Sequence, residues 1–142
     1  MGAYVVEQSL IQVGIPIDKA IIIGSGILDE LGIRETVDID VVVPKNEFDK
    51  LSENDNFIKA KKFDEDYYQS IDGQIEVWSD WWDYKRGEVI SFDVLAENSV
   101  VIDGIRYISL PFLRQWKSDC GRIKDIEDVK LIDEYAESSR ER

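Results

Sequence analysis

The stretch that decides the fold is Ala20-Ile21-Ile22-Ile23-Gly24-Ser25-Gly26, followed after a short helical segment by Thr36-Val37-Asp38-Ile39-Asp40-Val41-Val42-Val43. Both parts contain a run of apolar, mostly β-branched residues, which is typical of a strand buried on both faces. Residues two apart in a strand share a face, so Asp38 and Asp40 are expected to present two carboxylates side by side. A glycine-rich turn that opens a helix can bind phosphate oxygens, and paired carboxylates can bind Mg²⁺. The two segments together favour phosphoryl-transfer chemistry.

The composition is that of a folded and strongly acidic domain. The chain has 142 residues, 44% of them hydrophobic, and its 17 basic and 30 acidic side chains give a formal net charge of −13. This length predicts a single domain over residues 1–142. The acidic balance argues against a general nucleic-acid or anionic-membrane binder, but it leaves open one specific RNA substrate in a local basic groove.

Residue types that are missing or rare exclude several mechanisms. The chain has no histidine, so histidine-dependent triads and histidine-ligated zinc cannot operate. The single Cys120 cannot form an intramolecular disulfide and is predicted to be a small buried side chain. No segment reaches the roughly 18 apolar residues of a membrane span, and the N-terminus lacks a signal-peptide pattern. We therefore expect a cytoplasmic protein without a membrane partner.

The predicted elements alternate between helix and strand first, and hairpins and helices follow. Helices are predicted over 4–12, 27–31, 47–53, 111–121 and 124–138, and strands over 20–23 and 38–43, with hairpins over 67–78 and 100–108. Residues 58–63 are predicted to be either an edge strand or a loop, 79–87 a loop, and 137–142 a frayed tail. In the last helix, the stripe expected to be buried is Ile126, Val129, Ile132 and Ala136. The fold class that follows is α+β, a single domain with one mixed sheet flanked by helices.

In this order of motifs the chain resembles the nucleotidyltransferase superfamily, which has the DNA polymerase β-like fold. The likeness rests on the Gly24-Ser25 turn and on Thr36-Val37-Asp38-Ile39-Asp40, which is similar to the Thr-x-Asp-x-Asp motif of small bacterial members. Segments 101–110, 116–117 and 121–128 are similar to the tail of minimal members, among them toxin-type and antibiotic-modifying groups. The resemblance spans roughly residues 18–136 and implies that fold.

The resemblance also implies a site for divalent metals. Asp38 and Asp40 would bind Mg²⁺ or Mn²⁺, together with a third carboxylate that takes the proton of the attacking hydroxyl. The candidates for this third carboxylate are Asp72, Glu76, Asp80 and Asp93. Glu76 is favoured because it lies in the middle of an alternating strand, where the sheet would position it. Asp93 is the second choice, since its surroundings favour a helix face.

A bound nucleoside triphosphate is the second implication. The groups implied to hold its phosphates belong to the glycine-rich turn and the C-terminal helices, namely Gly24, Ser25, Gly26, Lys117 and Lys124. The two lysines fit equally well as surface residues or as partners of nearby acidic side chains. Arg34 would face the triphosphate or solvent, and Arg122 is predicted to pair with Asp125.

A group of aromatic residues surrounds the predicted loop over 79–87. These residues, Trp78, Trp81, Trp82 and Tyr84, are expected mainly to pack and anchor the loop, with stacking on a base or an acceptor ring as the alternative.

The function expected from these features is a metal-dependent nucleotidyltransferase. It would move a nucleoside monophosphate from a triphosphate to a hydroxyl of a small molecule, a protein side chain or a tRNA end, and release pyrophosphate. The alternative is a non-catalytic, nucleotide-binding relative that acts as an interaction or antitoxin-like partner. A glycosyltransferase with an Asp-x-Asp motif is less favoured, because it does not explain the Gly-Ser turn. A homodimer or a small partner protein is expected to complete the acceptor site, and a small helical protein encoded next to this chain would indicate a toxin–antitoxin pair.

Overall fold

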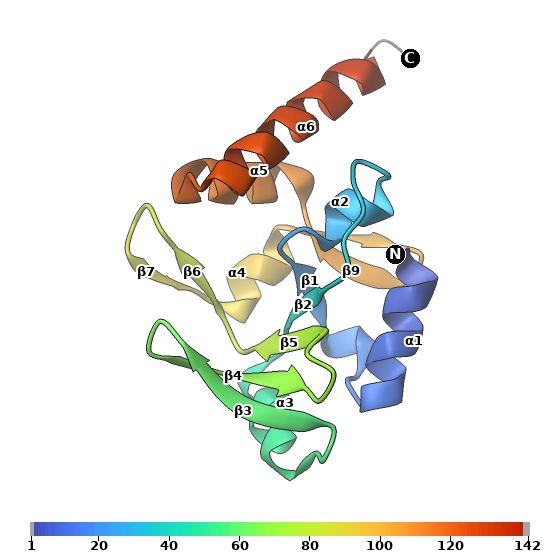
Figure 1. Cartoon of the computed structure of the whole chain (residues 1–142), viewed down its shortest axis with the longest axis vertical. Helices are drawn as coiled ribbons and strands as arrows, with labels where there is room; N and C mark the ends of the chain where they lie inside the picture. The colour runs from blue at the N-terminus through green and yellow to red at the C-terminus, as the bar shows by residue number, and fades with distance from the viewer. Residues whose placement is uncertain (1, 141–142) are drawn as a thin grey trace.

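The computed structural model describes residues 2–140 (Figure 1). The first half alternates between helix and strand. Its elements are α1 (Ala3–Val13), η1 (Ile17–Lys19), β1 (Ile21–Ile23), α2 (Gly26–Glu30), β2 (Ile39–Val42), α3 (Lys45–Lys50) and η2 (Leu51–Glu53). The second half contains β3 (Phe57–Lys62), β4 (Glu65–Ser70), β5 (Ile75–Trp78), β6 (Trp81–Asp83), β7 (Glu88–Ile90), α4 (Phe92–Glu97), β8 (Ser99–Ile102), β9 (Ile105–Ile108), α5 (Leu110–Cys120) and α6 (Ile123–Arg140). The predicted α+β class is confirmed.

Seven of the strands form one mixed sheet in the order β3-β4-β5-β2-β1-β9-β8. Strand β2 runs antiparallel to β1 and parallel to β5, and β1 runs parallel to β9. The central strands are buried on both faces, because all three residues of β1 and the pair Val41 and Val42 are at most 3% exposed. This confirms what their continuous apolar runs predicted.

Both Asp-Gly hairpins form as predicted. Gly73 and Gly104 have φ values of +78° and +82°, in the left-handed region that glycine adopts without steric cost. The uncertain segment over 58–63 lies within β3 and the residue after it, and β3 is an edge strand. Its three lysines suit that position, since charged side chains discourage further strand pairing.

Two predictions about local structure are wrong. The predicted loop over 79–87 contains β6 and the turn that joins it to β7, and the two form a separate hairpin. These three-residue strands are too short to give an alternating pattern. Residues 137–140, predicted to fray, continue α6 as a regular helix. Residues 141–142 of that tail lie outside the described residues.

The buried face of α6 also differs from the prediction. Ile126, expected to be buried, is 62% exposed, whereas Asp125 and Asp128 are 0% and 3% exposed. The apolar stripe did not predict which face of α6 is buried, because cations from elsewhere in the chain compensate these two buried carboxylates, as described below. Ile132 is buried as predicted.

The two C-terminal helices lie at one end of the molecule, beyond α2, and the β6–β7 hairpin extends beside α5 (Figure 1). A hydrogen bond joins these elements, since the indole Nε1 of Trp116 in α5 donates to the carbonyl oxygen of Trp82 in β6 at 2.8 Å. Cys120, at the end of α5, is a free and half-buried thiol. Within residues 2–140, no helix combines the length and apolar character needed to cross a membrane.

Candidate functional site

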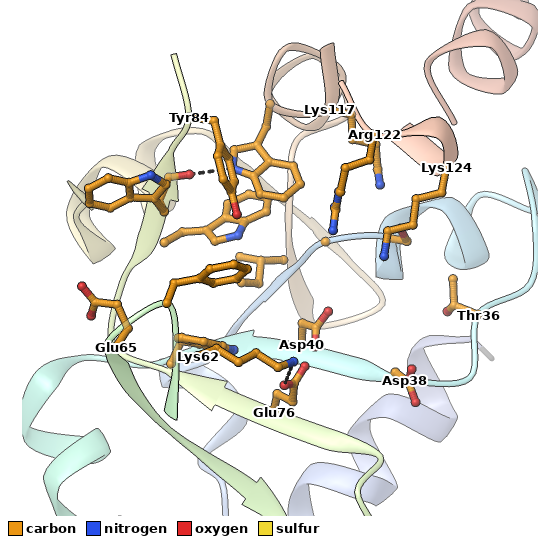
Figure 2. Close-up of a pocket in the computed structure, with 18 of the residues that line it drawn as sticks. Thr36, Asp38, Asp40, Lys62, Glu65, Glu76, Tyr84, Lys117, Arg122 and Lys124 are labelled. Carbon is orange, nitrogen blue, oxygen red and sulfur yellow. Dashed lines mark hydrogen bonds and ion pairs between the residues drawn. The ribbon is translucent and has the colours of Figure 1, made fainter. Parts of the chain in front are cut away.

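A cavity of about 880 Å³ brings together most of the predicted site residues (Figure 2). Its volume is in the range of small-molecule sites. The predicted residues among its lining are Gly24, Ser25, Asp38, Asp40, Glu76, Lys117 and Lys124. Gly26 is not part of the lining. A Cβ at Gly26 would collide with the side chain of Ile22, so Gly26 allows α2 to approach β1 closely.

The sheet places two carboxylates next to each other. Asp40 in β2 is in register with Glu76 in β5, so the two side chains extend from adjacent parallel strands. Asp38 lines the same cavity but precedes the first residue of β2 and is exposed. Figure 2 shows Asp38 beyond this pair, toward Thr36. Of the other candidates for the third carboxylate, Asp80 lines the cavity, whereas Asp72 and Asp93 do not. Asp93, the second choice, is exposed in the first turn of α4.

Asp40 is held in an unfavourable electrostatic environment. Its Oδ1 atom is buried and has no hydrogen-bond partner. Burial and the neighbouring Glu76 carboxyl raise the pKa of Asp40 from the ordinary value of 3.8 to about 7. Gly24 packs closely against the same carboxylate, since a Cβ at that position would lie 3.1 Å from Asp40 Oδ2. Asp40 therefore has a buried oxygen that a bound cation would compensate.

Lys62 supplies a positive charge next to this pair. Its ammonium Nζ, from the end of the edge strand β3, lies 2.6 Å from Glu76 Oε1. The hydrogen bond to Glu76 raises the pKa of Lys62, which keeps the amine protonated. Lys62 was not identified as a site residue from the sequence, because nothing local in the sequence links it to Glu76. Within residues 2–140, no group of three or more Asp, Glu, His or Cys side chains is arranged to hold a metal ion with the side chains as they stand.

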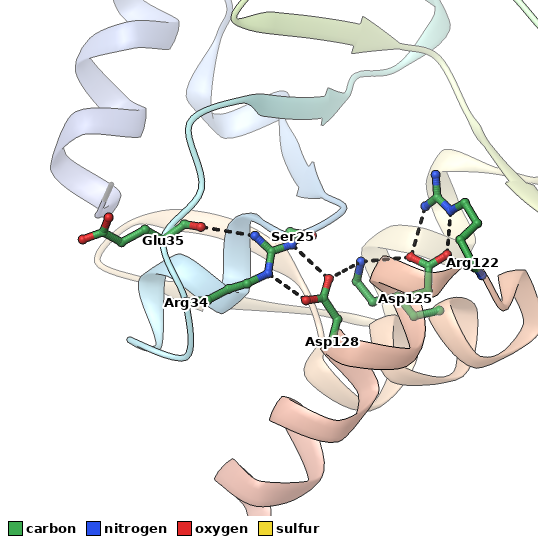
Figure 3. A network of polar contacts seen from close by, with 7 residues as sticks. Ser25, Arg34, Glu35, Arg122, Asp125 and Asp128 are labelled. Atoms are coloured by element: carbon green, nitrogen blue, oxygen red, sulfur yellow. Dashed lines mark hydrogen bonds and ion pairs between the residues drawn. The ribbon is translucent and has the colours of Figure 1, made fainter.

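Opposite the carboxylates, the cavity is lined by cations, and three of them, Arg34, Lys117 and Arg122, are paired with acidic side chains (Figure 3). Arg34 donates to both oxygens of Asp128 at 2.7 and 2.9 Å, and also to the hydroxyl of Ser25 at 2.8 Å. The Lys117 ammonium is buried and lies 2.8 Å from Asp128 and 3.4 Å from Asp125. Burial alone would raise the pKa of Asp128, but Arg34 and Lys117 outweigh it and hold that pKa below its ordinary value.

Arg122 and Lys124 are more exposed than Arg34 and Lys117. Arg122 forms the predicted pair with Asp125, at 2.6 and 3.1 Å, and its guanidinium lies 5.7 Å from the centre of the Trp116 ring. The exposed Lys124 lines the cavity and makes no ion pair with any residue in the described part of the chain. Figure 2 shows its ammonium directed into the cavity. Lys124 is thus better placed than Lys117 to bind an added anion.

A third part of the lining, which we call the aromatic wall, consists of Phe63, Trp78, Trp81, Trp82, Tyr84 and Trp116. Trp81 stacks on Trp116 with ring centroids 4.2 Å apart, and Tyr84 meets Trp116 edge-on at 5.6 Å. Trp78 stacks on Tyr67 at 4.5 Å. Trp78, Trp81 and Tyr84 thus pack against other rings, as predicted, whereas Trp82 is 39% exposed; all four line the cavity. Sequence reasoning did not include Phe63 or Trp116 in this group.

The site thus combines close carboxylates, a set of cations and an aromatic wall within one cavity. Comparisons of the chain with protein-family models, with curated proteins and with solved structures find no match.

Proposed function

We propose that this chain is a metal-dependent nucleotidyltransferase with a polymerase β-like fold, which moves a nucleoside monophosphate from a triphosphate to a hydroxyl acceptor and releases pyrophosphate. The observation that supports this proposal most directly is the pairing of Asp40 with Glu76 on adjacent parallel strands. Asp38, Ser25 and Lys124 share their cavity, so carboxylates and groups able to contact phosphate lie within reach of one ligand. The resemblance of the sequence motifs to that superfamily points to the same chemistry.

The donor set suits a hard divalent cation. Asp38, Asp40 and Glu76 offer only carboxylate oxygens, which are the ligands that Mg²⁺ and Mn²⁺ prefer. The unpartnered Oδ1 of Asp40 is the group that gains most from such a cation. Lys62 would have to release Glu76 for all three carboxylates to bind it. When bound, the cation would neutralise charge on the reacting phosphate and lower the pKa of the acceptor hydroxyl.

The other groups would position the triphosphate. The Ser25 hydroxyl already accepts a hydrogen bond from Arg34, so its own proton is free to be donated to a phosphate oxygen. Lys124 would add positive charge from the start of α6. Asp128 holds Arg34 and Lys117 at the base of this region, which keeps the Gly24-Ser25 turn next to α6. These contributions are orientation and charge neutralisation, as phosphoryl transfer generally requires.

The non-catalytic, nucleotide-binding relative is kept as a second candidate because of one observation. The ion pair of Lys62 with Glu76 compensates that carboxylate without a metal ion. A protein that only binds nucleotide would retain the cationic groups and the aromatic wall, and would have no need to break this pair. The two candidates agree on the ligand and differ in whether a covalent product forms.

A label-transfer assay tests the proposal. Each of the four α-³²P-labelled nucleoside triphosphates is incubated with the protein, Mg²⁺ or Mn²⁺, and cell extract, bulk tRNA or a panel of hydroxyl-bearing antibiotics. We expect label in one class of acceptor, loss of transfer in Asp40→Asn, and normal transfer in the matched control Asp93→Asn, which removes an exposed carboxylate outside the cavity. Nucleotide binding without any transfer would favour the second candidate. Equal transfer by wild type and Asp40→Asn would overturn the proposed site.

A further inference from the structure

We infer that the aromatic wall holds the nucleobase of the triphosphate and that Phe63 is a ring contact of this base. This inference rests on the proposed function, because it assigns a place to one part of the proposed substrate. It commits to the base, one of the two stacking partners that the sequence left as alternatives for the aromatic residues around 79–87, and it adds Phe63 and Trp116, which the sequence did not place in that group.

The first observation is the distribution of tryptophan. The chain contains four tryptophans, and all four line this cavity. Trp78, Trp81 and Trp82 are close together in the sequence, in β5 and the β6–β7 hairpin, and α5 brings Trp116 to them. None of the four is fully buried, and Trp82 is 39% exposed, although core packing alone would cover these rings. Their convergence on the lining of one cavity indicates a surface for a flat apolar ligand.

Phe63 supplies the second, independent observation. It is 84% exposed, lines the cavity from the β3–β4 turn, and has a φ of +53°. Its neighbour Asp64 has a φ of +63°, and turns with two successive positive φ values favour Asn-Gly over bulky residues. An exposed phenylalanine in this conformation gains nothing from packing and strains the backbone. Contact with a ring bound in the cavity accounts for it.

The wall also lies where the base of a nucleotide would be expected. Arg122 contacts the Trp116 ring and lines the same cavity as Ser25 and Lys124. A ligand whose phosphates lie against Ser25 and Lys124 can therefore extend toward the wall. A nucleotide has an anionic end and a flat aromatic end, so its phosphates would fit against Ser25 and Lys124 and its base against the aromatic wall. Purines should bind more tightly than pyrimidines because their stacking surface is larger.

The test compares ligands that share the phosphates but differ in the base. Calorimetric titrations with Mg²⁺ give the Kd of ATP, UTP and inorganic tripolyphosphate for wild type and Phe63→Gly, with tryptophan fluorescence as a second signal. Stacking on one aromatic side chain changes affinity by about 5- to 150-fold. We expect wild type to bind ATP more tightly than UTP, and UTP more tightly than tripolyphosphate. Phe63→Gly should lose at least about fivefold in ATP affinity and none in tripolyphosphate affinity.

A matched variant separates ligand contact from turn geometry. Asp64→Gly relieves backbone strain in the same turn but keeps the Phe63 ring, so it should retain ATP affinity. Phe63→Gly should melt at or above the wild-type temperature, because glycine fits the left-handed conformation. A structural role for Phe63 predicts the opposite, a lower melting temperature with unchanged ATP affinity, and would overturn the inference.

The remaining outcomes separate the inference from the proposed function. Equal affinities of wild type for ATP and tripolyphosphate would refute base stacking, while label transfer would still report on the transferase. A dependence on Phe63 that appears only for an aromatic acceptor, and not for ATP, would likewise refute the assignment to the nucleobase. Absence of binding by any triphosphate would refute both.

Discussion

Replacing Asp40 by asparagine is expected to abolish transfer and yet to stabilise the metal-free protein. The reason is the pKa of Asp40, which burial and the Glu76 carboxyl raise from 3.8 to about 7. The folded protein thus binds the Asp40 proton more tightly than the unfolded chain does. Ionisation of Asp40 costs no stability below about pH 4, costs progressively more as the pH rises to about 7, and has its full cost above that pH.

The size of the effect follows from the pKa difference. A difference of about 3 pH units corresponds to about 4 kcal/mol at 1.36 kcal/mol per unit, as an upper value. An asparagine side chain cannot ionise, so the Asp40→Asn variant avoids this cost. For a domain of this size, 1 kcal/mol shifts the melting temperature by about 3–5 °C, so we expect an increase on the order of 10 °C above about pH 7.5.

Thermal unfolding followed by circular dichroism between about pH 5 and pH 8.5, with a chelator present, measures this difference. The advantage of Asp40→Asn over wild type should grow as the pH rises through this range. Asp38→Asn is the matched control, because its carboxylate is exposed and its removal should leave the melting temperature nearly unchanged. Added Mn²⁺ should stabilise wild type and have little effect on Asp40→Asn.

The reasoning would be refuted if Asp40→Asn were no more stable than wild type at about pH 8, or if its advantage did not change with pH. Either result would mean that ionised Asp40 is well compensated in the folded protein. The Lys62 ammonium would then neutralise the carboxylate pair more completely than the raised pKa of Asp40 implies.

Three other substitutions probe the surroundings of this pair. Lys62→Met removes the cation that competes with a metal ion for Glu76, so the affinity for Mn²⁺ should rise several-fold. Electron paramagnetic resonance of free Mn²⁺ measures this affinity, and unchanged or weaker binding would contradict the competition. Asp128→Asn removes a negative charge that compensates the buried Lys117 ammonium, so it should lower the free energy of unfolding in urea by about 3 kcal/mol. A loss under about 1 kcal/mol would contradict the idea that Asp128 compensates Lys117. Gly24→Ala forces a side chain onto a φ of +63° and should cost about 1–2 kcal/mol in the same urea experiment; a neutral result would show that the turn can relax.

Much of the fold could be predicted because local patterns specify it. The apolar β-branched runs identified β1 and β2, and the two Asp-Gly turns identified the hairpins around Gly73 and Gly104. The β6–β7 hairpin escaped prediction, since strands of three residues have no measurable periodicity and depend on packing against Trp116. Short elements of this kind are stabilised by tertiary contacts more than by their own sequence.

For the candidate site, the sequence by itself determined which chemically active residue types lie in and around the segment from Gly24 to Asp40. The absence of histidine, the closely spaced Asp38 and Asp40, and the Gly24-Ser25 turn restricted the chemistry before any fold was known. These features are local, so spacing along the chain is sufficient to recognise them. The preference for Glu76 over Asp93 also came from a local strand pattern.

Only the tertiary structure decided which charges meet. The order of strands in the sheet puts Glu76 beside Asp40, and the edge strand brings Lys62 to that pair. The packing of α6 buries Asp128 against Arg34 and Lys117, although an apolar stripe would have buried Ile126 instead. The burial and pairing of a charge depend on residues distant in the sequence, and sequence spacing does not specify those distances.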